Sequence, residues 1–124
     1  MTTSKQVVVV LGASPKAERF SNQAVRLLKQ HGYRVIPVNP ACAIIEELPV
    51  AKDLGAIHAP VFTLSVYMGP ERSVALIAAM IALNPARVVL NPGTESPALE
   101  TALAAQGIPV VQDCTLRMLR EGRF

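Results

Sequence analysis

The sequence predicts a single α/β domain spanning residues 1–124, with a parallel sheet between two layers of helices. Apolar residues make up 51% of the chain, enough to bury a substantial core. Aromatic residues contribute only 4%, so the core must consist of Val, Leu, Ile and Ala, the usual filling of a helix-covered parallel sheet. Short apolar runs also alternate with helical stretches, which is the pattern of repeated βαβ units.

The first third of the chain predicts a strand, a helix and a second strand. Gln6–Leu11 contains a continuous β-branched run, typical of a central strand buried on both faces. Gly12–Pro15 ends this strand, and a helix follows at Ser21–Gln30 with the serine as its N-cap. Arg34–Val38 is the second strand. Pro37 cannot donate to a strand ladder, so we place it at the unpaired end.

The remaining chain continues the alternation after an irregular segment. Residues 41–60 have no clear periodicity, and we expect a helical turn at Ile44–Leu48. Val61–Tyr67 is the third strand, and a helix at Pro70–Leu83 begins with proline at its first position. The last elements are a strand at Arg87–Leu90, a helix from Ser96 to Gln106, a strand at Pro109–Gln112 and a short helix at Leu116–Glu121.

These units predict a Rossmann-like fold, a three-layer domain whose five parallel strands have the order 3-2-1-4-5. The topological switch then lies between the first and fourth strands, and ligands bind beside it at the carboxyl ends of the strands. We expect three loops to line this site, at residues 12–19, 39–42 and 91–95. Tyr67 and Met68, at the end of the third strand, complete it.

The first loop has the features of a phosphate site. Gly12 lets the backbone turn sharply after the strand, where a Cβ would intrude on the ligand side. Free N–H groups of Ala13 and Ser14, with the nearby helix N-terminus, then face a phosphate, and Lys16 and Arg19 add positive charge. The alternative stays open that Gly12 only makes a tight turn and that both basic side chains are solvated.

This loop differs from the dinucleotide fingerprint. The fingerprint G-x-G-x-x-G requires a second glycine where this chain has Ser14. An NAD site also needs an acidic residue after the second strand, where Asn39 and Pro40 stand. Both differences argue against NAD.

Other residues at the crevice have two interpretations each. Asn91, Pro92 and Gly93 follow the fourth strand, and they either contact a ligand or only turn the chain. Tyr67 either touches a base or packs on the sheet. No nucleophile lies in a recognisable pair with a base, so we expect no catalytic residue.

The sequence argues against several classes of function. Cys42, Cys114, His31 and His58 are isolated, which predicts no metal site. The net charge of +3 comes from scattered basic residues, so we expect no nucleic-acid partner. Val74–Leu83, the longest apolar run, has ten residues and is too short to span a membrane. The N-terminus has no hydrophobic leader, and we expect a cytoplasmic protein.

Two long stretches of the sequence resemble the small CoA-binding domain proteins of the YccU-like family. They are VVVVLGASPKAERFSNQAVRLLKQHGYRVIPVNP and RVVLNPGTESPALETALAAQGIPVVQDCTLRMLREGRF. The resemblance implies a Rossmann-like domain that binds coenzyme A, similar to the N-terminal domain of the succinyl-CoA synthetase alpha subunit. The synthetase's phosphohistidine domain and partner subunit have no counterpart in 124 residues, which implies a binding module without catalysis of its own.

The resemblance also implies which residues contact CoA. The phosphates are held by Gly12, Ala13 and Ser14, helped by Lys16 and Arg19. The adenosine portion is bordered by Asn39, Pro40, Tyr67 and Met68, and the other side of the crevice is closed by Asn91, Pro92 and Gly93.

Three functions therefore stay open at this point. The first is a module whose small-molecule ligand is CoA or acyl-CoA, and which acts as a carrier or sensor of acyl-CoA. The second is an enzyme that uses CoA or another nucleotide as a substrate, with Cys114 or His58 taking part. The third is a nucleotide-responsive interaction protein whose protein partner is unknown.

Overall fold

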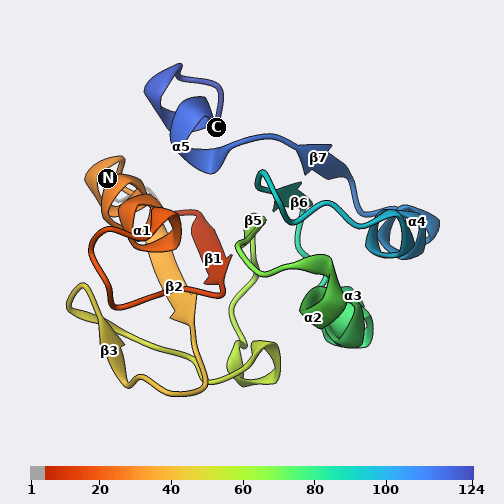
Figure 1. Cartoon of the computed structure of the whole chain (residues 1–124), viewed down its shortest axis with the longest axis horizontal. Helices are drawn as coiled ribbons and strands as arrows, with labels where there is room; N and C mark the ends of the chain where they lie inside the picture. Colours follow the sequence, from red (N-terminus) through yellow and green to blue (C-terminus); the bar gives the residue numbers. More distant parts are fainter. Residues whose placement is uncertain (1–4) are drawn as a thin grey trace.

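The computed structural model describes residues 5–124, which form a three-layer α/β domain (Figure 1). The central sheet has five parallel strands in the order β2-β1-β5-β6-β7. Its strands are β1 (Val7–Leu11), β2 (Arg34–Val38), β5 (Thr63–Val66), β6 (Arg87–Leu90) and β7 (Val110–Gln112). A separate antiparallel pair is formed by β3 (Ile44–Ile45) and β4 (Leu48–Pro49).

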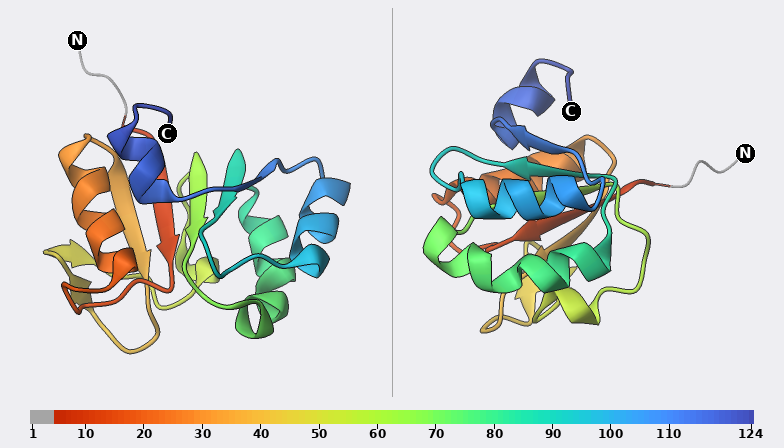
Figure 2. Two further views of the ribbon diagram at one scale, coloured as in Figure 1. Left: turned by 45° about the horizontal axis from the view of Figure 1, so that its top comes forward. Right: turned by 90° about the vertical axis from the view of Figure 1, so that its right-hand side faces the viewer.

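Helices cover both faces of this sheet (Figure 2). One face packs against α1 (Phe20–Gln30) and α5 (Thr115–Arg120). The other face packs against the 3₁₀ turn η1 (Leu54–Ala56), α3 (Ile77–Leu83) and α4 (Pro97–Ala105). Two short elements, α2 (Pro70–Ser73) and η2 (Val74–Leu76), precede α3. Among the described residues, none of the helices has the length and apolarity needed to cross a membrane.

Strand β1 is the centre of the core. All five of its residues are buried, and alternate side chains enter opposite layers. Val8 and Val10 belong to the core under α1, whereas Val7, Val9 and Leu11 belong to the core under α3 and α4. The prediction of a central strand buried on both faces is confirmed.

The fold class and the five-stranded parallel sheet are also confirmed, but one strand lies elsewhere than predicted. The expected order 3-2-1-4-5 places the third strand outside the second. That strand, β5, instead pairs with β1 and β6, so the five strands follow the order 2-1-3-4-5. The switch point therefore lies between β1 and β5, not between the first and fourth strands. All four residues of β5 are buried, as befits a central position, whereas β2 begins with the exposed Arg34.

β2 lies at one edge of the described sheet, and a residue from the following segment bonds to its outer side. Ala51 already occupies part of this edge, since its N–H donates to the Pro37 carbonyl at 2.9 Å and its carbonyl accepts from Asn39 N at 3.1 Å. The N–H and C=O of a strand residue point to the same side, so the N–H that Pro37 lacks would face outward. Pro37 is thus the next-to-last residue of β2, and the side of its backbone that lacks a donor faces the outer edge of the sheet.

Two local predictions were wrong. The expected helical turn at Ile44–Leu48 is a hairpin, because Glu46 and Glu47 both have positive φ (49° and 66°), as two-residue hairpin turns of type I′ require. The expected helix at Pro70–Leu83 is divided into α2, η2 and α3. By contrast, Ser96 caps α4 as predicted, and its Oγ accepts from the Leu99 N–H at 3.2 Å.

Candidate ligand-binding groove

The carboxyl ends of four strands meet at one edge of the sheet and form a groove there. It consists of two cavities. The β2-side cavity measures about 380 Å³ and the β6-side cavity about 570 Å³. Four residues line both cavities and form what we term the shared wall: Gly12, Ser14, Tyr67 and Arg72. Because Gly12 follows β1 and Tyr67 follows β5, the groove lies across the switch point, where parallel sheets bind ligands.

Gly12 is required by close packing between the loops after β1 and β5. Its φ is +86°, in the left-handed region that favours glycine. A Cβ at this position would lie 3.1 Å from the Tyr67 carbonyl oxygen and 3.2 Å from its carbon. The crowding therefore comes from the backbone of Tyr67, and not from the ligand side as the sequence suggested.

The two amides after Gly12 have different roles. Ala13 is buried, and its N–H donates to the Val38 carbonyl at 3.1 Å, so it is not free to face a phosphate as expected. Ser14, like Gly12, lines both cavities. Its hydroxyl accepts from Lys16 N at 3.1 Å, which closes a small turn.

Asn22 holds the loop from behind, which the sequence analysis missed. It is fully buried in the first turn of α1 and donates to the Ser14 carbonyl at 2.9 Å and to the Glu46 carboxylate at 3.1 Å. Arg26 donates to Asn22 Oδ1 at 2.8 Å and to the Ala17 carbonyl at 2.7 Å. These bonds turn the loop carbonyls toward the protein. An asparagine on the buried face of an amphipathic helix was the available signal.

The N-terminus of α1 faces the β6-side cavity. The helix begins after Arg19, not at a Ser21 cap as expected, and no side chain caps it. Its first turn contains no acidic residue, so its free N–H groups and positive dipole end can receive an anion. Lys16 and Arg19 both line this cavity, as predicted. The exposed ring of Phe20 lies beside them.

Residues after β2 and before η1 enclose the β2-side cavity. Asn39 and Pro40 line it, as predicted, and the Asn39 side chain also donates to the Ala13 carbonyl at 2.8 Å. Lys52 and Asp53, which the sequence analysis missed, line the same cavity. Asp53 therefore places a carboxylate beside the end of β2. The expectation that no acidic residue lies there is wrong, because Asp53 comes from a later segment of the chain.

Tyr67 and Met68 lie where the sequence predicted, although Tyr67 has two environments. Met68 lines the β2-side cavity, and Tyr67 lines both cavities. The Tyr67 hydroxyl is buried, and burial together with the nearby Cys114 raises the pKa of this phenol. The residue thus contributes to the groove wall while its hydroxyl stays protonated in the protein.

The residues after β6 divide between the groove and the core. Pro92 and Gly93 line the β6-side cavity, but Asn91 lines neither cavity and is only 1% exposed. Its amide donates to Ser65 Oγ at 2.9 Å and to the Val66 carbonyl at 2.8 Å. Its Oδ1 accepts from Thr115 N at 2.8 Å. Asn91 therefore joins β5, β6 and α5 beneath the groove.

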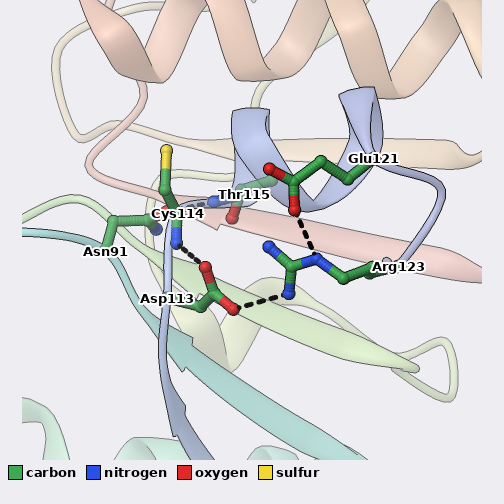
Figure 3. A network of polar contacts seen from close by, with 6 residues as sticks. All are labelled: Asn91, Asp113, Cys114, Thr115, Glu121 and Arg123. Carbon is green, nitrogen blue, oxygen red and sulfur yellow. Dashed lines mark hydrogen bonds and ion pairs between the residues drawn. The ribbon is translucent and has the colours of Figure 1, made fainter.

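A small polar network surrounds the start of α5 (Figure 3). Arg123 pairs with Asp113 at 2.9 Å and with Glu121 at 2.7 Å, and the hydrogen bond from Arg123 lowers the pKa of the Asp113 carboxyl. Cys114 donates its backbone N–H to Asp113 at 2.7 Å, and its sulfur points away from the ion pairs. Neither Cys114 nor the exposed His58 lines the groove.

The charges of the groove favour an anionic ligand. Four basic residues line it, of which Lys16 and Arg19 were predicted and Lys52 and Arg72 were not. Asp53 is the acidic residue among those lining the two cavities. Arg72 escaped the sequence analysis because it lies within α2, and only the residues directly after each strand were considered there.

The fold and the groove place this chain in the class of α/β domains that carry a ligand site at the switch point of a parallel sheet. Within that class, the chain belongs to the CoA binding domain family, whose model matches residues 6–120.

Several solved structures are similar to this chain. An uncharacterized protein shares 33% identity with a TM-score of 0.90, covering 98% of this chain and 100% of that one. A Thermus thermophilus protein shares 32% identity with a TM-score of 0.89, covering 97% and 91%. The fold also matches a dinucleotide-forming acetyl-coenzyme A synthetase of Ca. Korarchaeum cryptofilum at 18% identity, with a TM-score of 0.75, covering 87% of this chain and 25% of the synthetase. No curated protein matches this sequence.

Proposed function

We propose that this chain binds coenzyme A or an acyl-CoA in the groove and acts in the cytoplasm as a binding module. The observation that carries the proposal is the meeting of the Gly12 turn, the uncapped α1 N-terminus and four basic side chains at the switch point. CoA is an extended, polyanionic nucleotide, which suits a groove of two connected cavities. Membership of the CoA binding domain family supports the same ligand.

The shared wall is the natural place for the pyrophosphate of CoA. Ser14, from the loop after β1, and Arg72, from α2, both line the two cavities, so a group that they hold can extend into each. Lys16 and Arg19 reach the same region from the β6 side. The adenosine and the pantetheine arm then occupy different cavities.

The groove supports binding better than catalysis. Two serines line it: the Ser14 hydroxyl accepts from Lys16 N, and Ser21 is buried. No histidine or cysteine lines either of the two cavities. Asp53 Oδ1 accepts from the Ala56 N–H at 3.0 Å and caps η1. We therefore propose a module without turnover. Mass spectrometry of acetyl-CoA incubated with the purified protein should recover it unchanged, and hydrolysis above the buffer rate would contradict this.

Isothermal titration calorimetry should give a dissociation constant for CoA in the micromolar range, corresponding to about −8 kcal/mol. NAD should bind at least about tenfold more weakly, a difference of roughly 1.4 kcal/mol, because it lacks the 3′-phosphate and Ser14 replaces the second fingerprint glycine. Tighter binding of NAD than of CoA would overturn the proposal.

Replacement of Lys16 and Arg19 by alanine should weaken CoA binding by about 1–3 kcal/mol, if each makes a charge-assisted hydrogen bond to a phosphate. Arg120→Ala, which removes one positive charge on α5 outside both cavities, serves as the control and should bind CoA nearly normally. Equal affinity of the double variant and the wild type would show that both side chains are solvated and do not contact the ligand.

A further inference from the structure

Lys52 lies at the end of β2 in a position that suits recognition of a phosphorylated ribose. We propose that Lys52 binds the 3′-phosphate of CoA, which makes the β2-side cavity the 3′-phosphoadenosine subsite. The inference rests on the proposed function, and it adds Lys52 as a residue that determines specificity for the 3′-phosphate.

The backbone before Lys52 is fixed to the sheet. Ala51 forms a parallel bridge with Val38, and its N–H and C=O both bond to β2, at Pro37 and Asn39. Directly after Lys52, the Asp53 side chain caps η1. Lys52 is therefore held between two anchored residues, and it lines the same cavity as Asn39.

The end of the second strand is the part of a Rossmann domain that binds the ribose of a nucleotide ligand. In Rossmann domains the adenosine ribose lies at the end of the second strand, where an acidic residue binds its hydroxyls and a basic residue accommodates a ribose phosphate. Here Lys52 supplies the base and Asp53 the acid, both from the segment that follows the β3–β4 hairpin. Within residues 5–124 the Lys52 ammonium forms no ion pair, so its charge is available to a ligand.

The other basic residues of the groove have different positions. Lys16 and Arg19 line the β6-side cavity, and Arg72 belongs to the shared wall, where we place the pyrophosphate. Lys52 lines the β2-side cavity but not the β6-side cavity, and it differs in this from the other three basic residues of the groove. Its nearest acidic neighbour in sequence, Asp53, would repel a 3′-phosphate in the absence of the lysine.

The test compares CoA with dephospho-CoA, which lacks only the 3′-phosphate. By calorimetry, the wild type should prefer CoA by about ten- to a hundredfold, the range of one charge-assisted hydrogen bond. Lys52→Met should lower CoA affinity by that factor and leave dephospho-CoA affinity unchanged, so the preference disappears or reverses. Binding of dephospho-CoA by the variant also shows that it is folded.

Three further measurements sharpen the assignment. Lys52→Arg should retain the preference, because it retains the charge. Lys16→Met should weaken both ligands by the same factor, since the pyrophosphate is common to them. Adenosine 3′,5′-bisphosphate should bind the wild type and lose affinity in Lys52→Met, which would show that the effect belongs to the nucleotide end.

Equal binding of CoA and dephospho-CoA by the wild type would overturn the assignment of Lys52 and leave the proposed function standing. So would an equal loss of both ligands in Lys52→Met. Binding of neither ligand by the wild type would overturn the proposed function and this inference together.

Discussion

Replacement of Gly12 by valine should abolish CoA binding while the sheet and its helices still form. The valine would have to adopt a φ of +86°, and its Cβ would lie 3.1 Å from the Tyr67 carbonyl oxygen. The left-handed conformation costs of order 1–3 kcal/mol for a residue other than glycine, and the neighbour here is backbone. The loop must therefore move away from β5, which displaces Ser14 in the shared wall.

Circular dichroism and CoA titration on the same preparation measure both parts of this expectation. Gly32→Val is a matched control, because Gly32 has the same φ of +86° but nothing within 4 Å of a built Cβ. It lies after α1, outside both cavities, so Gly32→Val should have the same φ strain without the clash and keep its CoA affinity. A folded Gly12→Val protein that binds CoA normally would show that the ligand site lies elsewhere.

Asn91→Ala should lower the free energy of unfolding by about 2–4 kcal/mol, because it leaves several buried polar groups without partners. The Thr115 N–H loses its acceptor at the start of α5, and the Val66 carbonyl loses one donor. Ser65 keeps its contact with Thr115 at 2.8 Å, which limits the loss there. The melting temperature should fall by roughly 10 °C for a domain of this size.

Thermal unfolding and CoA titration together distinguish the two roles considered for Asn91. CoA affinity of the folded variant should stay within about threefold of the wild type, equivalent to roughly 0.7 kcal/mol, because Asn91 lines neither cavity. Gln106→Ala, an exposed change at the end of α4, should alter stability by less than about 0.5 kcal/mol. An Asn91→Ala protein of normal stability that no longer binds CoA would make Asn91 a ligand contact.

The sequence by itself determined the elements whose causes are local. The run Val7–Leu11 can only be a buried strand, and Gly12 had to turn the chain because glycine alone adopts its φ cheaply. Ser96 before Pro97 fixed the start of α4. The loops at the carboxyl ends of the strands were identified from these local signals. Eleven of the twelve predicted contact residues line the two cavities, and Asn91 does not.

The tertiary structure alone decided which of these local pieces became neighbours. Periodicity reports how one strand is buried but not beside which strand it lies, so β5 was placed at the wrong side of β2 although its own limits were nearly right. The same reason hid Lys52 and Asp53, whose segment reaches the groove only because Ala51 pairs with the edge of β2. Asn91 shows the converse: its position after β6 was predicted, but its burial depends on α5 packing over it, a contact between residues far apart in the chain.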